Sequence, residues 1–244
     1  MTRHILITGA SSGIGLGLAR TCLAAGDKVL AVQRRSSPLV GSAGYQEVLH
    51  DLTDYAGTGA RVAQLVGSAG MLDLVVLNAG TLGRIEDMAD VSIAELQQTM
   101  AVNAWANKAL LDALFALPIP TKQVVGMSSG AAVSGNRGWS GYALSKATFL
   151  MMLKLYAAEH PRTHFTSFAP GLVDTGMQDY LCGLGKDVAV RFPSVASIQA
   201  RRGTQGMPSP EEVGARFVEA FRRLLAEPSG SFIDIRKWDK APEA

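Results

Sequence analysis

The chain has 244 residues, with 23 lysines and arginines against 21 aspartates and glutamates, and a formal net charge of +2. It is 48% hydrophobic and 18% charged, and no apolar run approaches the roughly 20 residues that a membrane-spanning helix needs. This composition argues against a disordered chain and a membrane span. No basic cluster exceeds Arg34-Arg35 or Arg222-Arg223, so we expect no nucleic-acid partner.

Length and cysteine content set the domain count and the compartment. Chains of about 250 residues often form one α/β domain, so we expect a single domain over residues 1–244. Cys22 and Cys182 lack metal-ligand spacing, and the first residues lead into a strand rather than a signal peptide. We therefore expect a cytoplasmic protein without a metal site. The 26 glycines, about 11% of the chain against a typical ~7%, indicate that many backbone positions must be bare.

Short apolar runs alternate with helical patterns along the chain. The predicted strands are 5–7, 29–32, 45–49, 74–77, 124–127, 165–168 and 231–235, and the predicted helices are about 14–25, 57–68, 92–116, 141–159 and 210–226. Ser92 with Glu95, and Ser209 with Glu212, give capping boxes that start two of these helices. Apolar strands separated by helices indicate an α/β fold: a doubly wound parallel sheet with helices on both faces, in three layers.

A glycine-rich loop joins the first strand to the first helix. Residues 8–15 read Thr-Gly-Ala-Ser-Ser-Gly-Ile-Gly. Bare backbone at such a loop can approach a pyrophosphate, which the free N–H groups of the helix N-terminus would bind. The candidate contacts are Gly9, Ser11, Ser12, Gly13, Ile14 and Gly15. Taken alone, the loop also fits an ordinary glycine-rich turn.

The end of the second strand bears on the choice of dinucleotide. Gln33 lies 20 residues after Gly13, where dinucleotide-binding folds place the acidic residue that holds the ribose of NAD. Arg34 and Arg35 follow, and an arginine here accommodates the 2′-phosphate of NADP. The pattern favours NADP(H), with Arg34 as the main ligand and Arg35 as a weaker one. The alternative is that both are solvated loop residues.

A tyrosine and a lysine supply candidate acid–base chemistry. Tyr142 and Lys146 stand four residues apart on a predicted helix and share one face. Carbonyl reduction by a nicotinamide needs a proton donor from the protein, and a nearby ammonium stabilises a phenolate. Tyr142 is the candidate acid, and Lys146 is the group expected to lower its pKa. At this spacing the two could also be an ordinary surface pair.

Together these segments resemble the short-chain dehydrogenase/reductase superfamily, whose fold is a Rossmann-like sheet. The motifs that carry the resemblance are the loop at 8–15, Asn78-Ala79-Gly80, Ser129 thirteen residues before Tyr142, the run Tyr142-Ala143-Leu144-Ser145-Lys146, and Pro170-Gly171-Leu172-Val173-Asp174-Thr175. The resemblance implies that Tyr142 is the general acid and that Ser129 binds the substrate oxygen. It also implies that Asn103 completes the catalytic set by ordering a water beside Lys146, the alternative being a solvent-facing side chain.

The resemblance also assigns cofactor contacts beyond the glycine loop. The residues are Asp51 and Leu52 at the adenine, Asn78, Ala79 and Gly80 beside the adenosine ribose, Tyr142 and Lys146, and Pro170, Gly171, Val173 and Thr175 near the nicotinamide and phosphates. The segment at about 175–206 stands where the family keeps a substrate lid, which excludes water from the reaction. Family members usually form homodimers or homotetramers through helices that correspond to 92–116 and 141–159.

A narrower resemblance suggests a substrate class. Residues 128–132, 138–142, 169–178 and 230–235 are similar to sepiapterin reductases and bacterial benzil reductases, which reduce adjacent dicarbonyl groups with NADPH. It implies NADPH-dependent reduction of a ketone, a dicarbonyl or a pterin side-chain ketone. Ser129, Tyr142 and Met177 would then bind the substrate.

Two further substrate residues stay open. Asp234 matches a pterin-anchoring aspartate by position, or it simply bonds backbone or a subunit contact. Trp139 either walls the substrate pocket or packs under the catalytic helix. The alternative functions are an NADP+-dependent secondary-alcohol dehydrogenase and a dinucleotide-binding regulator without turnover.

Overall fold

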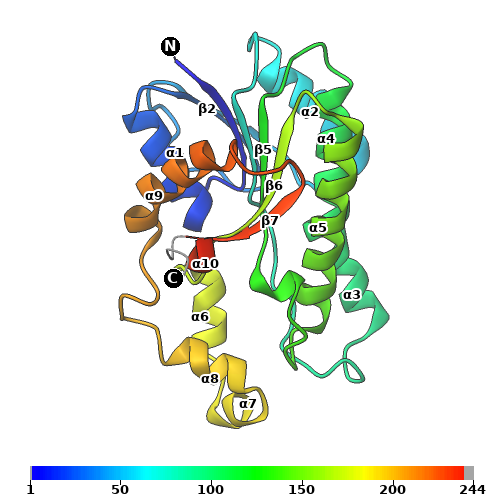
Figure 1. The fold of residues 1–244 in the computed structure, drawn as a ribbon, viewed down its shortest axis with the longest axis vertical. Coiled ribbons are helices and arrows are strands. Elements are labelled where there is room, and N and C mark those ends of the chain that lie inside the picture. Colours follow the sequence, from blue (N-terminus) through cyan, green and yellow to red (C-terminus); the bar gives the residue numbers. More distant parts are fainter. Residues whose placement is uncertain (1, 239–244) are drawn as a thin grey trace.

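The computed structural model describes residues 2–238. Seven parallel strands form one sheet in the order β3-β2-β1-β4-β5-β6-β7 (Figure 1). They are β1 (His4–Thr8), β2 (Lys28–Gln33), β3 (Tyr45–Leu49), β4 (Leu74–Leu77), β5 (Gln123–Met127), β6 (His164–Ala169) and β7 (Ser231–Asp234). The expected doubly wound parallel sheet is confirmed.

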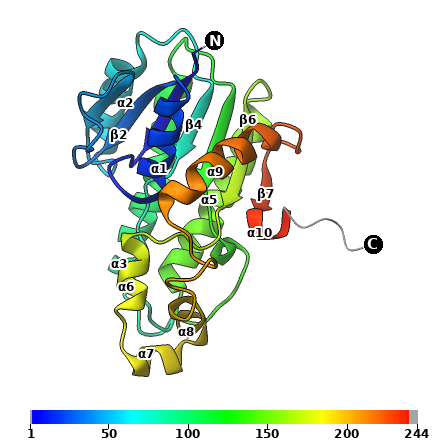
Figure 2. The ribbon, with the colours of Figure 1, turned by 90° about the vertical axis from the view of Figure 1, so that its left-hand side faces the viewer.

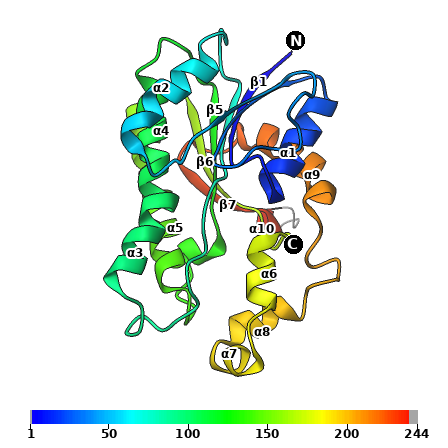
Figure 3. The same cartoon turned by 180° about the vertical axis from the view of Figure 1, so that it is seen from behind.

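Helices cover both faces of this sheet. Figures 1 and 3 show α1 (Gly13–Ala24) and α9 (Pro210–Leu224) on one face, and α2 (Tyr55–Val66), α4 (Ala106–Phe115) and α5 (Ser140–Glu159) on the other. Successive residues of a strand point to opposite faces. Ile5 and Ile7 of β1 therefore join the apolar layer under α1 and α9, whereas Leu6 joins the layer under α2, α4 and α5. Both layers are apolar, so the strands contain continuous hydrophobic runs.

Local capping chemistry sets the start of helices α2, α3 (Ile93–Met100) and α9. Both expected capping boxes, at Ser92 and Ser209, are present. Helix α2 begins two residues before its predicted start because the Asp54 side chain accepts a hydrogen bond from the backbone N–H of Gly57. The last strand ends one residue early, since Ile235 begins the short helix α10 (Ile235–Trp238).

The helix expected over residues 92–116 is not uniform. It consists of α3 (Ile93–Met100), the π-helical turn η1 (Ala101–Trp105) and α4. The wider turn coincides with the fully buried Asn103, whose backbone oxygen accepts a hydrogen bond from the Asn107 side chain. A π-turn inside an α-helix often marks a functional site. The prediction of a regular helix is thus wrong at these five residues.

Three short helices after β6 extend away from the sheet (Figure 2). They are α6 (Gly176–Cys182), α7 (Lys186–Arg191) and α8 (Pro193–Gln199). Leu181, Phe192 and Val195 from this segment form a small apolar cluster with Tyr142 of α5. Across residues 2–238, no helix has both the length and the apolar character to cross a membrane.

From β1 to β3 the chain adds strands on one side of β1, and from β4 to β7 it adds them on the other side. The strand order therefore reverses between β1 and β4. In open parallel sheets, ligands bind outside the carboxyl ends of the strands at this point. The glycine loop after β1 and the Asn78-Ala79-Gly80 segment after β4 both lie there.

Candidate active site

A cavity of about 900 Å³ extends from the loops after β1, β2 and β3 to helices α6 and α8. Of the residues predicted to form the site, all but Gly15 and Asn103 line it. Three buried polar atoms in its wall, Gln33 Oε1, Ser128 Oγ and Gln178 Oε1, have no hydrogen-bond partner among the described residues. Because such atoms are costly to leave unpaired, this wall is suited to a polar ligand.

The glycine loop has the shape of a phosphate cradle. Gly9 and Gly13 have positive φ angles of 72° and 55°. A Cβ on Gly15 would lie 2.2 Å from the Gly9 oxygen and 2.6 Å from Asn78 Nδ2. Asn78 Nδ2 also donates hydrogen bonds of 3.0 Å to the oxygens of Thr8 and Gly9, so it locks the loop onto β4. Gly15 therefore permits the loop to close without lining the cavity itself.

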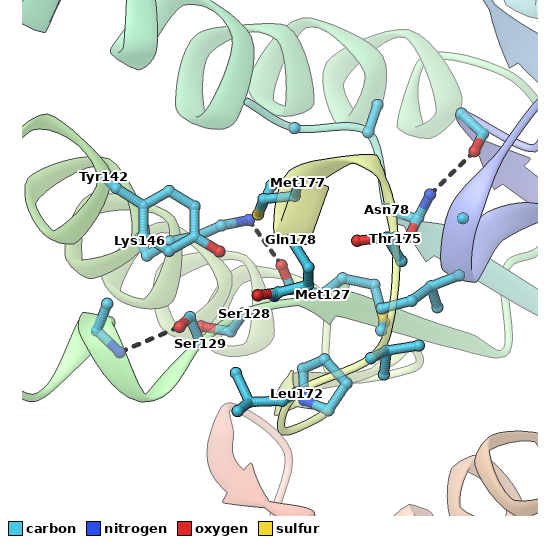
Figure 4. A pocket seen from close by; sticks show the side chains of 18 of the residues that line it. Asn78, Met127, Ser128, Ser129, Tyr142, Lys146, Leu172, Thr175, Met177 and Gln178 are labelled. Carbon is cyan, nitrogen blue, oxygen red and sulfur yellow. Dashed lines mark hydrogen bonds between the residues drawn. The ribbon is translucent and has the colours of Figure 1, made fainter. Parts of the chain in front are cut away.

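The segment after β6 faces this loop. Thr175 lies against Gly13, where a Cβ would come 3.3 Å from Thr175 Cγ2. Figure 4 shows Asn78 and Thr175 at one side of the cavity, Tyr142 and Lys146 at the other, and Met177 and Gln178 between them. The motifs from residues 9, 78 and 175 thus form one continuous surface, which a dinucleotide phosphate fits.

The end of the cavity predicted to hold adenosine, called the adenosine end below, carries exposed cations. The Arg34 side chain is 74% exposed and stands 3.9 Å from Asp51 Oδ2. Two hydrogen bonds from Thr53, helped by Arg34, lower the pKa of Asp51. Gln33 is buried and donates to Glu47, so an amide stands at the end of β2, where NAD-binding folds carry an acidic residue. Arg35 lines the same end.

Tyr142, Lys146 and Ser129 meet at the carboxyl end of β5. Tyr142 and Lys146 project from the first two turns of α5, and both are buried. Lys146 Nζ donates a 2.8 Å hydrogen bond to the backbone oxygen of Met127 and lies 5.7 Å from the centroid of the Tyr142 ring. Ser129 Oγ accepts from the backbone N–H of Ala131, so its own hydrogen points either to Tyr142 or to a ligand.

Burial sets the protonation of this group. It raises the pKa of Tyr142 to about 12, and the Ser129 hydroxyl opposes the rise only in part. Burial also lowers the pKa of Lys146 to about 8. The lysine was expected to lower the pKa of the phenol, and in this structure desolvation outweighs that effect. At neutral pH the pair is therefore a phenol beside an ammonium ion.

Asn103 stands behind the catalytic group. Its Oδ1 accepts from the backbone N–H of Thr81, and its Nδ2 donates to the Thr81 oxygen and to Ser145 Oγ, at 2.8, 2.8 and 2.9 Å. A Cβ on Gly80 would lie 3.1 Å from Asn103 Oδ1 and 3.6 Å from Lys146 Nζ, so the two side chains flank that glycine. The alternative of a solvent-facing Asn103 is wrong. Its side chain fixes the Thr81 backbone and α5, and the expected water stays a prediction.

The lid end is closed by side chains. Trp139 lines the cavity 5.9 Å from the Tyr142 ring, and its Nε1 donates a 2.8 Å hydrogen bond to Ser194 Oγ of α8. Asp87 accepts hydrogen bonds from Arg137 and from Arg191 of α7. Those two arginines lower the pKa of Asp87 to about 2. The segment of α7 and α8, for which a lid role stays a prediction, is therefore held to the loops that carry Asp87 and Trp139.

Asp234 lines the cavity but is not a free anchor. Both of its carboxylate oxygens accept hydrogen bonds from the Arg236 guanidinium, at 2.9 and 2.6 Å. Sequence reasoning missed several lining residues that no motif marks, namely Ser194, Arg201, Arg236 and Lys237. Ser128 and Gln178 also line the cavity; they lie within runs that carry the resemblance, but no role was assigned to them.

Residues 3–182 match the short chain dehydrogenase family. The chain is 34% identical over 181 residues to an uncharacterised oxidoreductase of Schizosaccharomyces pombe, covering 71% of this chain and 72% of that protein. It is 32% identical over 199 residues to a benzil reductase ((S)-benzoin forming) of Saccharomyces cerevisiae, covering 73% and 74%. A benzil reductase of Bacillus subtilis is 26% identical over 96% of this chain and 98% of its own length.

Solved structures agree on the fold. The KRED1-Pglu enzyme superposes with a TM-score of 0.81 at 25% identity, covering 95% of this chain and all of that one. Levodione reductase gives 0.80 at 21% identity, covering 96% and 95%. With the family match and the arrangement of Ser129, Tyr142 and Lys146, these likenesses show that the chain belongs to the short-chain dehydrogenase/reductase family of oxidoreductases, which use a nicotinamide dinucleotide.

Proposed function

We propose that this protein reduces a ketone or dicarbonyl, a pterin side-chain ketone included, to an alcohol with NADPH, and that Tyr142 donates the proton. The observation that carries the proposal is the placement of Tyr142: a buried phenol whose ring centroid lies 5.7 Å from Lys146 Nζ, beside the Ser129 hydroxyl, in the wall of a large cavity. A phenol with a pKa of about 12 is still much more acidic than an alcohol, so it can protonate a developing alkoxide.

Each residue of the group has a defined task. Ser129 donates its hydroxyl hydrogen to the carbonyl oxygen and orients it toward Tyr142. Tyr142 then gives its proton to that oxygen as the alkoxide forms. The nearby Lys146 cation stabilises the resulting phenolate and binds the nicotinamide ribose hydroxyls. NADPH, when bound, supplies the hydride; its sites are the glycine loop, Asn78-Ala79-Gly80 and the Pro170–Thr175 segment.

The choice of NADP(H) rests on the end of β2. Gln33 replaces the carboxylate that would repel a 2′-phosphate, and Arg34 and Arg35 are exposed beside it. The likeness to two benzil reductases supports a dicarbonyl as substrate.

Surface composition supports self-association. Helix α5 and the π-turn η1 before α4 expose large apolar side chains. They are Trp105, Leu144, Met151 and Leu155. We include a homodimer or homotetramer through these helices in the proposal. We also place this single-domain protein, whose lid spans about 175–206, in the reducing cytoplasm, where two free cysteines persist.

Replacement of Tyr142 by Phe tests the mechanism, because it keeps the ring and removes the proton donor. NADPH oxidation would be followed with a panel of diketones, ketones and aldehydes, and repeated with NADH. We expect a loss of kcat of about 100-fold or more with unchanged NADPH affinity. Tyr180→Phe, an exposed tyrosine outside the cavity, is the matched control and should behave as wild type. Retention of most turnover by Tyr142→Phe would contradict the assignment.

A further inference from the structure

The chain leaves β7 beside the catalytic group and places an arginine in the cavity wall. Arg236 Nε and its backbone N–H donate to Asp234 Oδ1, at 2.9 and 3.0 Å, and Arg236 Nη2 donates to Oδ2 at 2.6 Å. Asp234 is buried, whereas the Arg236 side chain is 49% exposed. Both carboxylate oxygens of Asp234 are thus already hydrogen-bonded to Arg236. The half-exposed guanidinium is the part of the pair that a ligand can contact.

Two glycines make room for this arginine. A Cβ on Gly130 would lie 3.1 Å from Arg236 Nη2, and a Cβ on Gly171 would lie 3.3 Å from its Cγ and Cδ. Gly130 directly follows Ser129, and Gly171 belongs to the segment assigned to the nicotinamide. The guanidinium therefore lies against both loops that hold the reacting groups.

Asp234 accepts from only some of the N–H donors of the Arg236 guanidinium. An arginine side chain has five N–H donors, of which Asp234 takes one from Nε and one from Nη2. No described residue accepts from Nη1. Its hydrogens, with one more on Nη2, remain for a ligand, and this donor arrangement suits a carboxylate.

Basic side chains outnumber acidic ones at the substrate end of the cavity. The only carboxylates among the described lining residues are Asp51, near Arg34 at the adenosine end, and Asp234, which is paired. Arg201 and Lys237 line the cavity too, and neither forms an ion pair within residues 2–238. The substrate end thus carries excess positive charge, which favours an anionic ligand.

We propose that the substrate is a keto acid, and that Arg236, held in place by Asp234, binds its carboxylate while Ser129 and Tyr142 bind its keto oxygen. The proposal deepens the proposed function and rests on it. Arg201 and Lys237 raise the local potential without needing direct contact. Asp234 is then a positioning residue rather than an anchor for a neutral heterocycle.

Paired substrates test this assignment. The wild-type enzyme would be given 2-, 4- and 5-oxo acids and the methyl ester of each with saturating NADPH, together with a neutral diketone. We expect at least one acid to exceed its ester about tenfold or more in kcat/KM, because the ester cannot make the hydrogen bond between charged groups that the carboxylate makes with Arg236. In Arg236→Gln that preference should disappear, with the esters and the KM for NADPH unchanged. Arg236→Lys should keep part of it.

Arg162→Gln, a distant exposed arginine, is the control and should match wild type. Equal use of acids and esters by the wild type, or an equal loss for both in Arg236→Gln, overturns the proposal. So does a raised KM for NADPH in Arg236→Gln, since it would make Arg236 a cofactor ligand.

A binding measurement separates this proposal from the reductase assignment. Calorimetric titration of the NADP+-saturated protein with 4-oxopentanoate and its homologues needs no turnover. Binding that is lost in Arg236→Gln supports the site even if no carbonyl is reduced, in which case the proposed reaction fails. Reduction of the neutral diketone with neither binding nor reduction of any keto acid overturns the keto-acid proposal and leaves the reductase assignment standing.

Discussion

The adenosine end of the cavity is formed largely by main chain, whereas the lid end is formed by side chains from segments distant in sequence. At the first end, Gly9, Gly13 and Gly80 present backbone, and Asn78 ties the loop to β4. At the second end, Trp139 and Arg236 form the wall through partners on other elements or turns. A backbone surface accepts the same ligand regardless of nearby side chains, while a side-chain surface changes with single substitutions. The first end therefore suits a common cofactor and the second an individual substrate.

Gly15→Ala tests the adenosine end most severely. The new Cβ would meet the Gly9 backbone oxygen at 2.2 Å, so the loop must move. We expect the free energy of unfolding to fall by about 1–3 kcal/mol, as for overpacked sites, and NADPH binding to be lost. Urea unfolding and fluorescence titration with NADPH would measure both.

Gly59→Ala is the matched control, because it lies within α2 and its Cβ would have nothing within 4 Å. It should raise the free energy of unfolding by about 0.5–1 kcal/mol. If the two variants behaved alike, the glycine loop would not be a close-fitting cradle.

Lys146→Met tests the group of Ser129, Tyr142 and Lys146, which lies between the two ends of the cavity. Below pH 8 the ammonium is charged in the native and unfolded states, and its burial costs native stability. From pH 8 to about 10.4 only the native state loses the proton, so the unfolded state binds more protons and wild-type stability rises relative to the variant. We expect the difference in free energy of unfolding to change by about 2–3 kcal/mol between pH 7 and 10.5, measured in urea. A difference independent of pH would show that the lysine is not desolvated.

Arg34→Ala tests the adenosine end at its exposed rim. Removing one charged hydrogen-bond donor to a phosphate should raise the KM for NADPH about tenfold and leave the KM for NADH unchanged. Arg35→Ala should show a smaller effect of the same kind. Equal KM values for the two cofactors in the wild type would refute the NADP(H) assignment.

Asp87→Asn tests the lid with the smallest expected effect. It weakens the ion pairs with Arg137 and Arg191, whose side chains are 63% and 51% exposed. Exposed ion pairs contribute little and are screened by salt. We expect the KM for the carbonyl substrate to rise about two- to fivefold at low salt and the difference to shrink at high salt. Glu219→Gln, which removes an exposed pair within α9, should leave KM unchanged.

The contrast between the two ends of the cavity also explains which features could be predicted from the sequence. Short local patterns, such as the run from Thr8 to Gly15, predict the sheet and the loop between β1 and α1, and both are confirmed. The phosphate-binding role of the loop stays a prediction. Arg236 could not be recognised, because Gly130 and Gly171, which it packs against, come beside it only when β5, β6 and β7 align. The lowered pKa expected for Tyr142 failed for a related reason: burial depends on the whole lid cluster, not on the spacing to Lys146.

The π-turn at Ala101–Trp105 acts as a one-residue insertion in a helix. Each residue of an α-helix turns the chain by about 100°, so the extra residue shifts the phase of α4 against α3 by that amount. Within this turn Asn103 is fully buried, and Trp105, two positions later, is 44% exposed. Removal of one residue here would regularise the helix and rotate either the catalytic-site support or the exposed apolar surface out of place. The one extra residue of the π-turn thus sets both the position of Asn103 behind the candidate active site and the position of the exposed surface through which copies of the chain would meet.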